Sequence, residues 1–172
     1  MLIDGVPLTI RPIRADDSDA LRAMHRGLTE RTIYQRFLGL HPELTPQEAD
    51  YFTHVDGVRR FALVAAAPDG SLVAVGRYDR LPPDWLTAEV AFVVADAYQH
   101  HGLGTALVSM LVAHARTAGV QSFVADVLTS NRAMQHAFTD SGLSARSTRD
   151  HDVAHLDMPI FADTDPGQPC PR

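Results

Sequence analysis

One stretch, residues 87–120, constrains the fold of this chain more than any other: an apolar run, a glycine-containing loop and a helix-like segment in succession. The run Val90–Val94 is short and rich in β-branched residues, which is typical of a buried strand. From Thr105 to Ala118 apolar residues recur at helical spacing, and Gly119 marks the end of that helix. The chain must therefore place a strand and a helix on either side of a tight turn.

The turn itself, residues 99–105, reads QHHGLGT. Gly102 and Gly104 let the backbone turn tightly before the helix, where unpaired N–H groups and the helix dipole favour an anion. A tight turn that binds nothing is the alternative interpretation. The P-loop pattern is excluded because the chain contains no lysine, and the dinucleotide fingerprint is excluded because Leu107 stands where it needs a third glycine. A phosphate or pyrophosphate site of another kind remains.

Composition narrows the class of protein. At 172 residues and 45% hydrophobic, the chain predicts one globular domain over residues 1–160, with a flexible tail over 161–172. The net charge of −6 disfavours a nucleic-acid binder. No apolar run reaches the length of a membrane span, and the first residues do not form a signal peptide. The single cysteine, Cys170, cannot form an internal disulfide, which favours a cytoplasmic location.

Patterning along the rest of the chain predicts alternating strands and helices. Expected helices are 18–28, 29–40, 45–54, 105–118 and 131–141, the third with a proline at its first position and a capping-box glutamate. Expected strands are 8–13, 60–67, 71–78, 90–94, 122–128, 143–147 and 151–160.

The pattern Gln99-x-x-Gly102-x-Gly104, after a hydrophobic strand with one glutamate, resembles the acyl-CoA loop of the GCN5-related N-acetyltransferase (GNAT) family. The order of elements over residues 7–160 is similar to that family as well. The resemblance implies an α/β (α+β) fold, a single domain whose mixed, mostly antiparallel sheet of about six or seven strands is flanked by helices. Several phrases resemble the bacterial branch that acetylates acyl-CoA synthetases on a protein lysine: LTIRPIRADDSDALRAMHRGLTERTIYQRFL, HPELTPQEADYFTHVD, AEVAFVVADAYQHHGLG and VLTSNRAMQHAF.

The resemblance implies acetyl-CoA as acyl donor, with its pyrophosphate bound by the loop. The residues implicated are Gln99, His100, His101, Gly102, Leu103, Gly104 and Thr105, of which Thr105 could instead cap the helix. Relatives usually carry glycine at position 100 and a basic residue nearby. Because an imidazole is only partly protonated near neutral pH, the two histidines predict weaker, pH-dependent attraction for phosphate. Two solvent-exposed loop histidines are the other interpretation. A metal site is not expected, because adjacent histidines rarely converge on one ion.

Main-chain groups of Phe92, Val93 and Val94 would pair with the amides of pantetheine, as the resemblance implies. An N–H of Val93 or Val94 would polarise the thioester carbonyl. Asn131 is expected both to cap the following helix and to hydrogen-bond the cofactor.

Glu89 is the candidate general base, since an amine acceptor must lose a proton before it can attack. The chain has four glutamates, and only Glu89 lies on the strand that would carry the acyl group. The alternative is that Glu89 forms an ion pair with Arg77 or Arg80. Many relatives place a tyrosine as thiolate acid where this chain has Phe138, so either water protonates the thiolate or it leaves unaided.

The sequence thus predicts direct acetyl transfer from acetyl-CoA to an amine, without a covalent enzyme intermediate. A protein lysine is the preferred acceptor, possibly on an acyl-CoA synthetase. A small-molecule amine is the enzymatic alternative, and a non-catalytic acyl-CoA sensor is the other class. The acceptor would lie near residues 26–40 and 149–152, with Tyr34, Arg36 and Asp152 as candidates. The oligomeric state stays open.

Overall fold

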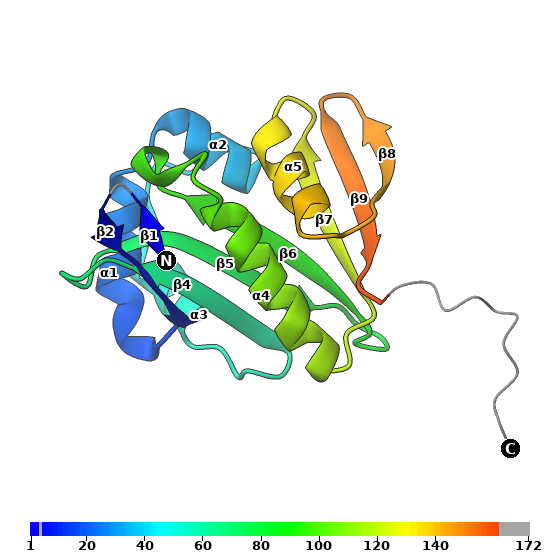
Figure 1. The fold of residues 1–172 in the computed structure, drawn as a ribbon, viewed down its shortest axis with the longest axis horizontal. Helices are drawn as coiled ribbons and strands as arrows, with labels where there is room; N and C mark the ends of the chain where they lie inside the picture. The colour runs from blue at the N-terminus through cyan, green and yellow to red at the C-terminus, as the bar shows by residue number, and fades with distance from the viewer. Residues whose placement is uncertain (4, 162–172) are drawn as a thin grey trace, which may run out of the picture.

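Seven strands form one sheet in the order β3-β4-β5-β6-β7-β9-β8, and a short hairpin, β1-β2, precedes it (Figure 1). The computed structural model describes residues 1–3 and 5–161, so most of the expected tail, with Cys170, lies outside the described residues. The strands are β1 Leu2–Ile3, β2 Val6–Pro7, β3 Thr9–Pro12, β4 Arg60–Ala66, β5 Leu72–Arg80, β6 Thr87–Val94, β7 Ser122–Leu128, β8 Arg146–Asp150 and β9 Val153–Pro159.

Helices cover both faces of the sheet (Figure 1). Helices α4 and α5 lie on one face, whereas α1 and α3 lie on the other, and α2 stands at the end where β6 finishes. The helices are α1 Ser18–Arg26, α2 Glu30–Phe37, α3 Pro46–Thr53, α4 Leu103–Thr117 and α5 Arg132–Asp140, with short 3-10 turns η1 Ala15–Asp17 and η2 Asp96–Tyr98. In the part of the chain that the structure describes, no helix could cross a membrane.

Only one pair of neighbouring strands is parallel. β6 and β7 run in the same direction, and every other neighbouring pair in the sheet is antiparallel. The expected mixed, mostly antiparallel sheet is therefore confirmed. The parallel ladder joins only three residue pairs, from Thr87 and Ser122 to Glu89 and Val124. Beyond them the two strands continue without pairing to each other.

Two apolar clusters, one on each face of the sheet, form the core. The larger contains Leu107 and Leu111 of α4, and the smaller contains Leu21 and Met24 of α1. On β5, Gly76 allows close packing, because a Cβ built there would lie 2.7 Å from the ring of Phe92. A side chain at that position would push against the strand that borders the parallel ladder.

Element boundaries differ from the sequence-based expectation in a few places. The β1-β2 hairpin was not expected, because its strands have two residues each and no alternation to read. β8 begins at Arg146 instead of residue 143. Leu143 is buried in the core directly after Gly142 turns through φ 84°, and all five residues of β8 are exposed, so no apolar alternation marks that strand.

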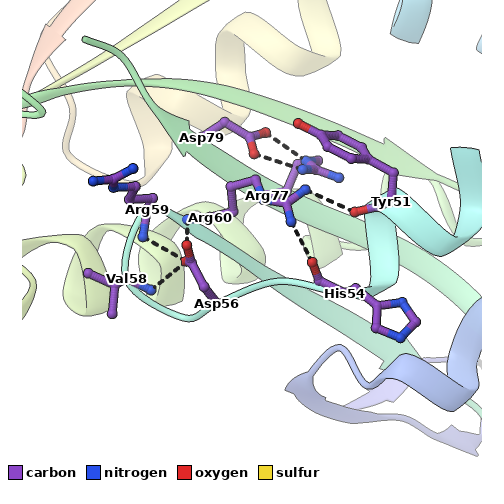
Figure 2. Close-up of polar contacts among 8 residues, drawn as sticks. All are labelled: Tyr51, His54, Asp56, Val58, Arg59, Arg60, Arg77 and Asp79. Carbon is purple, nitrogen blue, oxygen red and sulfur yellow. Dashed lines mark hydrogen bonds and ion pairs between the residues drawn. The ribbon is translucent and has the colours of Figure 1, made fainter. Parts of the chain in front are cut away.

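Local hydrogen bonds fix where the helices begin. The expected capping box at α3 is present: Glu48 N–H donates to the Thr45 hydroxyl at 3.3 Å, and Thr45 N–H donates to the Glu48 carboxylate at 2.9 Å. After α3, the Arg60 guanidinium donates to the carbonyl oxygens of Tyr51 and His54, and Asp56 accepts three backbone N–H groups (Figure 2). These bonds hold the end of α3 against β4.

Asp17 joins the first sheet strand to α1. Its carboxylate accepts two hydrogen bonds from the Arg11 guanidinium, both at 2.7 Å, and one from Arg14 N–H. The Arg11 hydrogen bonds, reinforced by the Arg14 amide and the nearby positive charges, outweigh the effect of burial and hold the pKa of Asp17 below its ordinary value.

We predict that Asp17→Asn lowers the free energy of unfolding by about 2 kcal/mol at pH 7, because the buried Asp17 carboxylate no longer neutralises the half-buried Arg11. A carboxylate with a lowered folded-state pKa stabilises the fold above its unfolded pKa of about 4, and this contribution is lost as pH falls through the folded-state value. Urea unfolding at pH 7 and pH 3 should therefore show a smaller difference at pH 3. Asp16→Asn, at an exposed neighbouring position, is the control. An equal loss in both variants would contradict the assignment.

Candidate functional site

The divergence of β6 from β7 opens a cleft of about 760 Å³ in the sheet. Side chains and backbone from α2, β6, the loop before α4, β7 and α5 line it, and Figure 1 shows these elements around the ends of the two strands. Segments far apart in the sequence thus meet at one place. The chemistry of the site depends on this opening.

Backbone groups of alternate β6 residues face the cleft. On the β5 side, Leu81 N–H donates to Thr87 O and Ala95 N–H donates to Val73 O. Since antiparallel ladders alternate, the main-chain groups of residues 89, 91 and 93 also face β5. Those of Val90, Phe92 and Val94 then face the gap beside β7. The thioester carbonyl was expected to be polarised by the N–H of Val93 or of Val94. The Val93 N–H faces β5, whereas the Val94 N–H faces the gap, so Val94 is the candidate that the geometry allows.

The loop delivers the start of α4 to the same cleft. The helix begins at Leu103, two residues earlier than expected, after Gly102 with φ 77°. Its first helical hydrogen bond runs from Ala106 N–H to Gly102 O at 3.0 Å. The N–H groups of Leu103, Gly104 and Thr105 therefore have no partner within the helix. Gly102 is the N-cap residue, so the alternative of Thr105 as the cap is not observed.

The two loop histidines have different positions. His100 lines the cleft and is exposed, with φ 64°, a left-handed conformation that favours glycine. This is the position where glycine is usual in the family that the sequence resembles. His101 is also exposed but is not among the residues that line the cleft.

A hydrogen-bond network ties α2 to the loop. The Gln99 side-chain amide donates to Val94 O at 3.0 Å and to the Thr32 hydroxyl at 3.2 Å. The Asp96 carboxylate accepts from Thr29 N–H and from the Thr29 and Thr32 hydroxyls. Burial alone would raise the pKa of Asp96, but these hydrogen bonds outweigh it and lower the pKa. The first turn of α2 is thereby fixed against the wall of the cleft.

Glu89 lies on the cleft wall and is exposed. The expected alternative, an ion pair with an arginine of β5, is not observed within the described residues. Arg77 instead donates two hydrogen bonds to Asp79, at 2.8 and 2.9 Å, and Arg80 donates to the carbonyl oxygen of Ala118. The Glu89 carboxylate is left available to a ligand.

Helix α5 borders the other side of the cleft. Asn131 caps this helix as expected, its side-chain oxygen accepting from Met134 N–H at 3.2 Å, and it also lines the cleft. Phe138 is buried and meets the ring of Phe92 edge to face at 5.8 Å. The place where many relatives have a tyrosine is therefore part of the apolar floor.

The three residues expected at the acceptor side do not all lie at the cleft. Arg36 lines the cleft, whereas Tyr34 and Asp152 do not. The structure also brings in cleft residues that the sequence analysis did not single out: Arg31, Gln35, Tyr98, Asp126, Arg132 and His136. The spacing of four between 31 and 35, and between 132 and 136, puts each pair on one helix face, and that spacing could have drawn attention to them.

Comparison with known proteins agrees with this geometry. Residues 25–143 match the acetyltransferase (GNAT) family. The chain belongs to the GNAT family. It therefore belongs to an acetyltransferase family and has the fold that the sequence predicted. Among the described residues, no group of three or more His, Cys, Asp and Glu side chains could hold a metal ion.

Two curated relatives are bacterial acetyltransferases. The chain is 33% identical over 127 residues to acetyltransferase Pat of Mycolicibacterium smegmatis, covering 73% of this chain and 38% of that relative. It is 33% identical over 137 residues to acetyltransferase PA5475 of Pseudomonas aeruginosa, covering 78% of this chain and 73% of the relative. This GNAT chain thus spans well under half the length of the mycobacterial Pat that it matches.

Solved structures show the same fold. The GNAT domain of S. lividans PAT superposes with a TM-score of 0.82 at 34% identity, covering 90% of this chain and 91% of that one. YncA of Salmonella typhimurium, described as a putative acetyltransferase with its cofactor acetyl-CoA, superposes with a TM-score of 0.73 at 17% identity, covering 92% and 97%. The second likeness concerns the fold alone.

We predict that His100→Gly raises the free energy of unfolding by about 0.5–1 kcal/mol, since glycine removes the cost of a left-handed side-chain-bearing residue and only part of that gain is lost to unfolded-state entropy. His100→Ala keeps the backbone cost but removes the ring, and it should not stabilise. Urea unfolding of the three proteins measures this. Equal stabilisation by both substitutions would show that the ring, not the backbone, is responsible.

Proposed function

We propose that this GNAT enzyme transfers the acetyl group of acetyl-CoA to the side-chain amine of a protein lysine. One observation carries the proposal: a free strand edge, the unpaired amides at the start of a helix and an available glutamate all line the same cleft. Similarity to the bacterial Pat proteins supports a protein acceptor, and a cytoplasmic acyl-CoA synthetase is the preferred target.

The cleft fits acetyl-CoA in two respects. The unpaired N–H groups of Leu103, Gly104 and Thr105, together with the dipole of α4, suit the pyrophosphate. The main-chain groups of Phe92 and the N–H of Val94 are left to pair with the pantetheine amides as an added strand would. The Asn131 side chain keeps its NH₂ group for the cofactor while its oxygen caps α5.

The acetyl group would be transferred beside β6. Glu89, directly or through water, accepts a proton from the lysine ammonium, which frees the nitrogen lone pair. The nitrogen then attacks the thioester carbonyl and the new C–N bond forms. The nitrogen passes its second proton to water, and the C–S bond breaks as the tetrahedral intermediate collapses. The N–H of Val94 stabilises the oxyanion in between. Because Phe138 has no proton to give, water protonates the thiolate or it leaves unaided.

We predict that Glu89→Gln lowers kcat by roughly 10²–10⁴-fold, because the amide cannot accept the proton, while affinity for acetyl-CoA stays unchanged. The first measurement is transfer of labelled acetyl from acetyl-CoA into a host lysate, read by mass spectrometry. Label on a lysine of one or a few proteins, absent with the variant, is the expected result.

Other outcomes of that assay decide against the proposal. Label confined to the small-molecule fraction would move the acceptor to a free amine. No transfer by the unmodified protein, combined with retained acetyl-CoA binding, would indicate an acyl-CoA sensor. Full activity of the Glu89→Gln protein would remove Glu89 from the mechanism.

We also predict that Gly104→Glu abolishes measurable acetyl-CoA binding, because a carboxylate at the start of α4 opposes the pyrophosphate in charge and occupies its space. The fold should tolerate the change, since a Cβ at Gly104 would lie 3.6 Å from the Ala137 Cβ, an ordinary contact. Isothermal calorimetry with acetyl-CoA measures the affinity, and Gly104→Ala is the matched control. Unchanged affinity in Gly104→Glu would overturn the loop assignment.

A further inference from the structure

Arg36 places a positive charge on the cleft wall. It lies in the last turn of α2, is half-buried and lines the cleft. Within residues 1–3 and 5–161, its guanidinium has no hydrogen bond or ion pair, and its described contact is the ring of Phe37, 4.9 Å from the guanidinium carbon to the ring centroid. A partly buried guanidinium that nothing neutralises at close range is costly unless a ligand supplies the anion.

The nearest comparison is the neighbouring Arg77. This side chain is buried, but Asp79 neutralises it through two hydrogen bonds in the close-up of Figure 2. Burial and the charge of Arg77 lower the pKa of Arg36 to about 10, while Glu89 and Asp79 oppose that shift. Arg36 therefore stays a cation at neutral pH, and Asp79 is already engaged by Arg77.

On the side of Arg36 away from the cleft, the described residues include no acidic side chain that could neutralise it. There Arg36, Phe37 and Val93 also line a small pocket of about 40 Å³. The other residues around this pocket are apolar side chains, His25 and Arg77, and none is acidic. An anion that pairs with Arg36 must come from the cleft.

The cleft wall near Arg36 belongs to the acceptor side. Val93 packs with the smaller core cluster on the α1 and α3 face of the sheet, and strand alternation puts the Glu89 side chain on the same face. Glu89 and Arg36 thus offer one negative and one positive group to whatever approaches the thioester from this side. Such a pair is complementary to a molecule that carries an ammonium and a carboxylate.

We propose that Arg36 determines acceptor specificity by binding a carboxylate that the amine acceptor carries near its reacting nitrogen. This rests on the proposed function, in which the acceptor is a lysine. The carboxylate is then an aspartate or glutamate side chain close to that lysine in the protein substrate. The planar guanidinium can bind a carboxylate through two parallel hydrogen bonds, so the contact is directional as well as strong.

The test uses the full chain, acetyl-CoA and a peptide library in which every peptide has one central lysine and randomised flanking residues. Acetylated peptides are identified by mass spectrometry. The unmodified protein should enrich Asp and Glu at one or more flanking positions, and Arg36→Gln should lose that enrichment. For a matched pair of peptides, Arg36→Gln should lower kcat/KM about tenfold or more with the acidic peptide and change it little with its amide counterpart.

Two further variants separate recognition from a structural effect. Arg146→Gln removes the same charge from an exposed position of β8 outside the cleft, and it should behave like the unmodified protein. Arg36→Lys keeps the charge and should restore part of the preference for the acidic peptide. The affinity of Arg36→Gln for acetyl-CoA should be unchanged.

The possible failures are distinguishable. Acetylation without any preference for acidic flanks, or an equal loss on both peptides in Arg36→Gln, would overturn the role of Arg36 and leave the lysine acceptor standing. Arg36-dependent preference for succinyl-CoA over acetyl-CoA would place the carboxylate on the acyl donor instead and also overturn it. Absence of transfer to every lysine peptide and to lysate proteins would overturn the lysine acceptor itself.

Discussion

The short parallel ladder between β6 and β7 is the constraint on which the rest of the site depends. Hydrogen bonding stops after Glu89 and Val124, so the remaining main-chain groups on the facing edge of β6 have no strand to pair with. Unpaired backbone groups inside a protein are costly, and they persist where a ligand or water can satisfy them. The opening is thus a gap in the sheet, and we propose its unpaired edge as the template for a peptide-like cofactor.

Rigid neighbours hold that gap in shape. The rings of Phe92 and Phe138 pack edge to face beneath it, and Gly76 leaves room for Phe92 on the other strand. At the open end, Gln99 and Asp96 fix the loop to α2 through hydrogen bonds. The same contacts bring α2, and with it Arg36, to the cleft wall beside that loop.

Much of the fold could be predicted from the sequence because the signals are local. The capping box at Thr45 and the helical spacing of α4 appear in the structure as expected, and Asn131 caps α5. Strand β8 could not be placed, since its exposed residues show no alternation. For the site, the sequence indicated the loop and Glu89, but it left the ion pair with Arg77 or Arg80 open. Only the tertiary partners of these arginines, Asp79 and the Ala118 carbonyl oxygen, decide that question.

Taken alone, the sequence determined the order of strands and helices, the glycine loop before α4 and the family, because periodicity, turn residues and motif spacing act within a few residues of one another. Tertiary structure decided which β6 amides face the cleft, which cations are neutralised and which remain free. Those properties depend on partners brought from distant segments, as Asp79 is to Arg77 and α2 is to β6. Charge compensation and strand-edge exposure are therefore consequences of packing, and no local pattern encodes them.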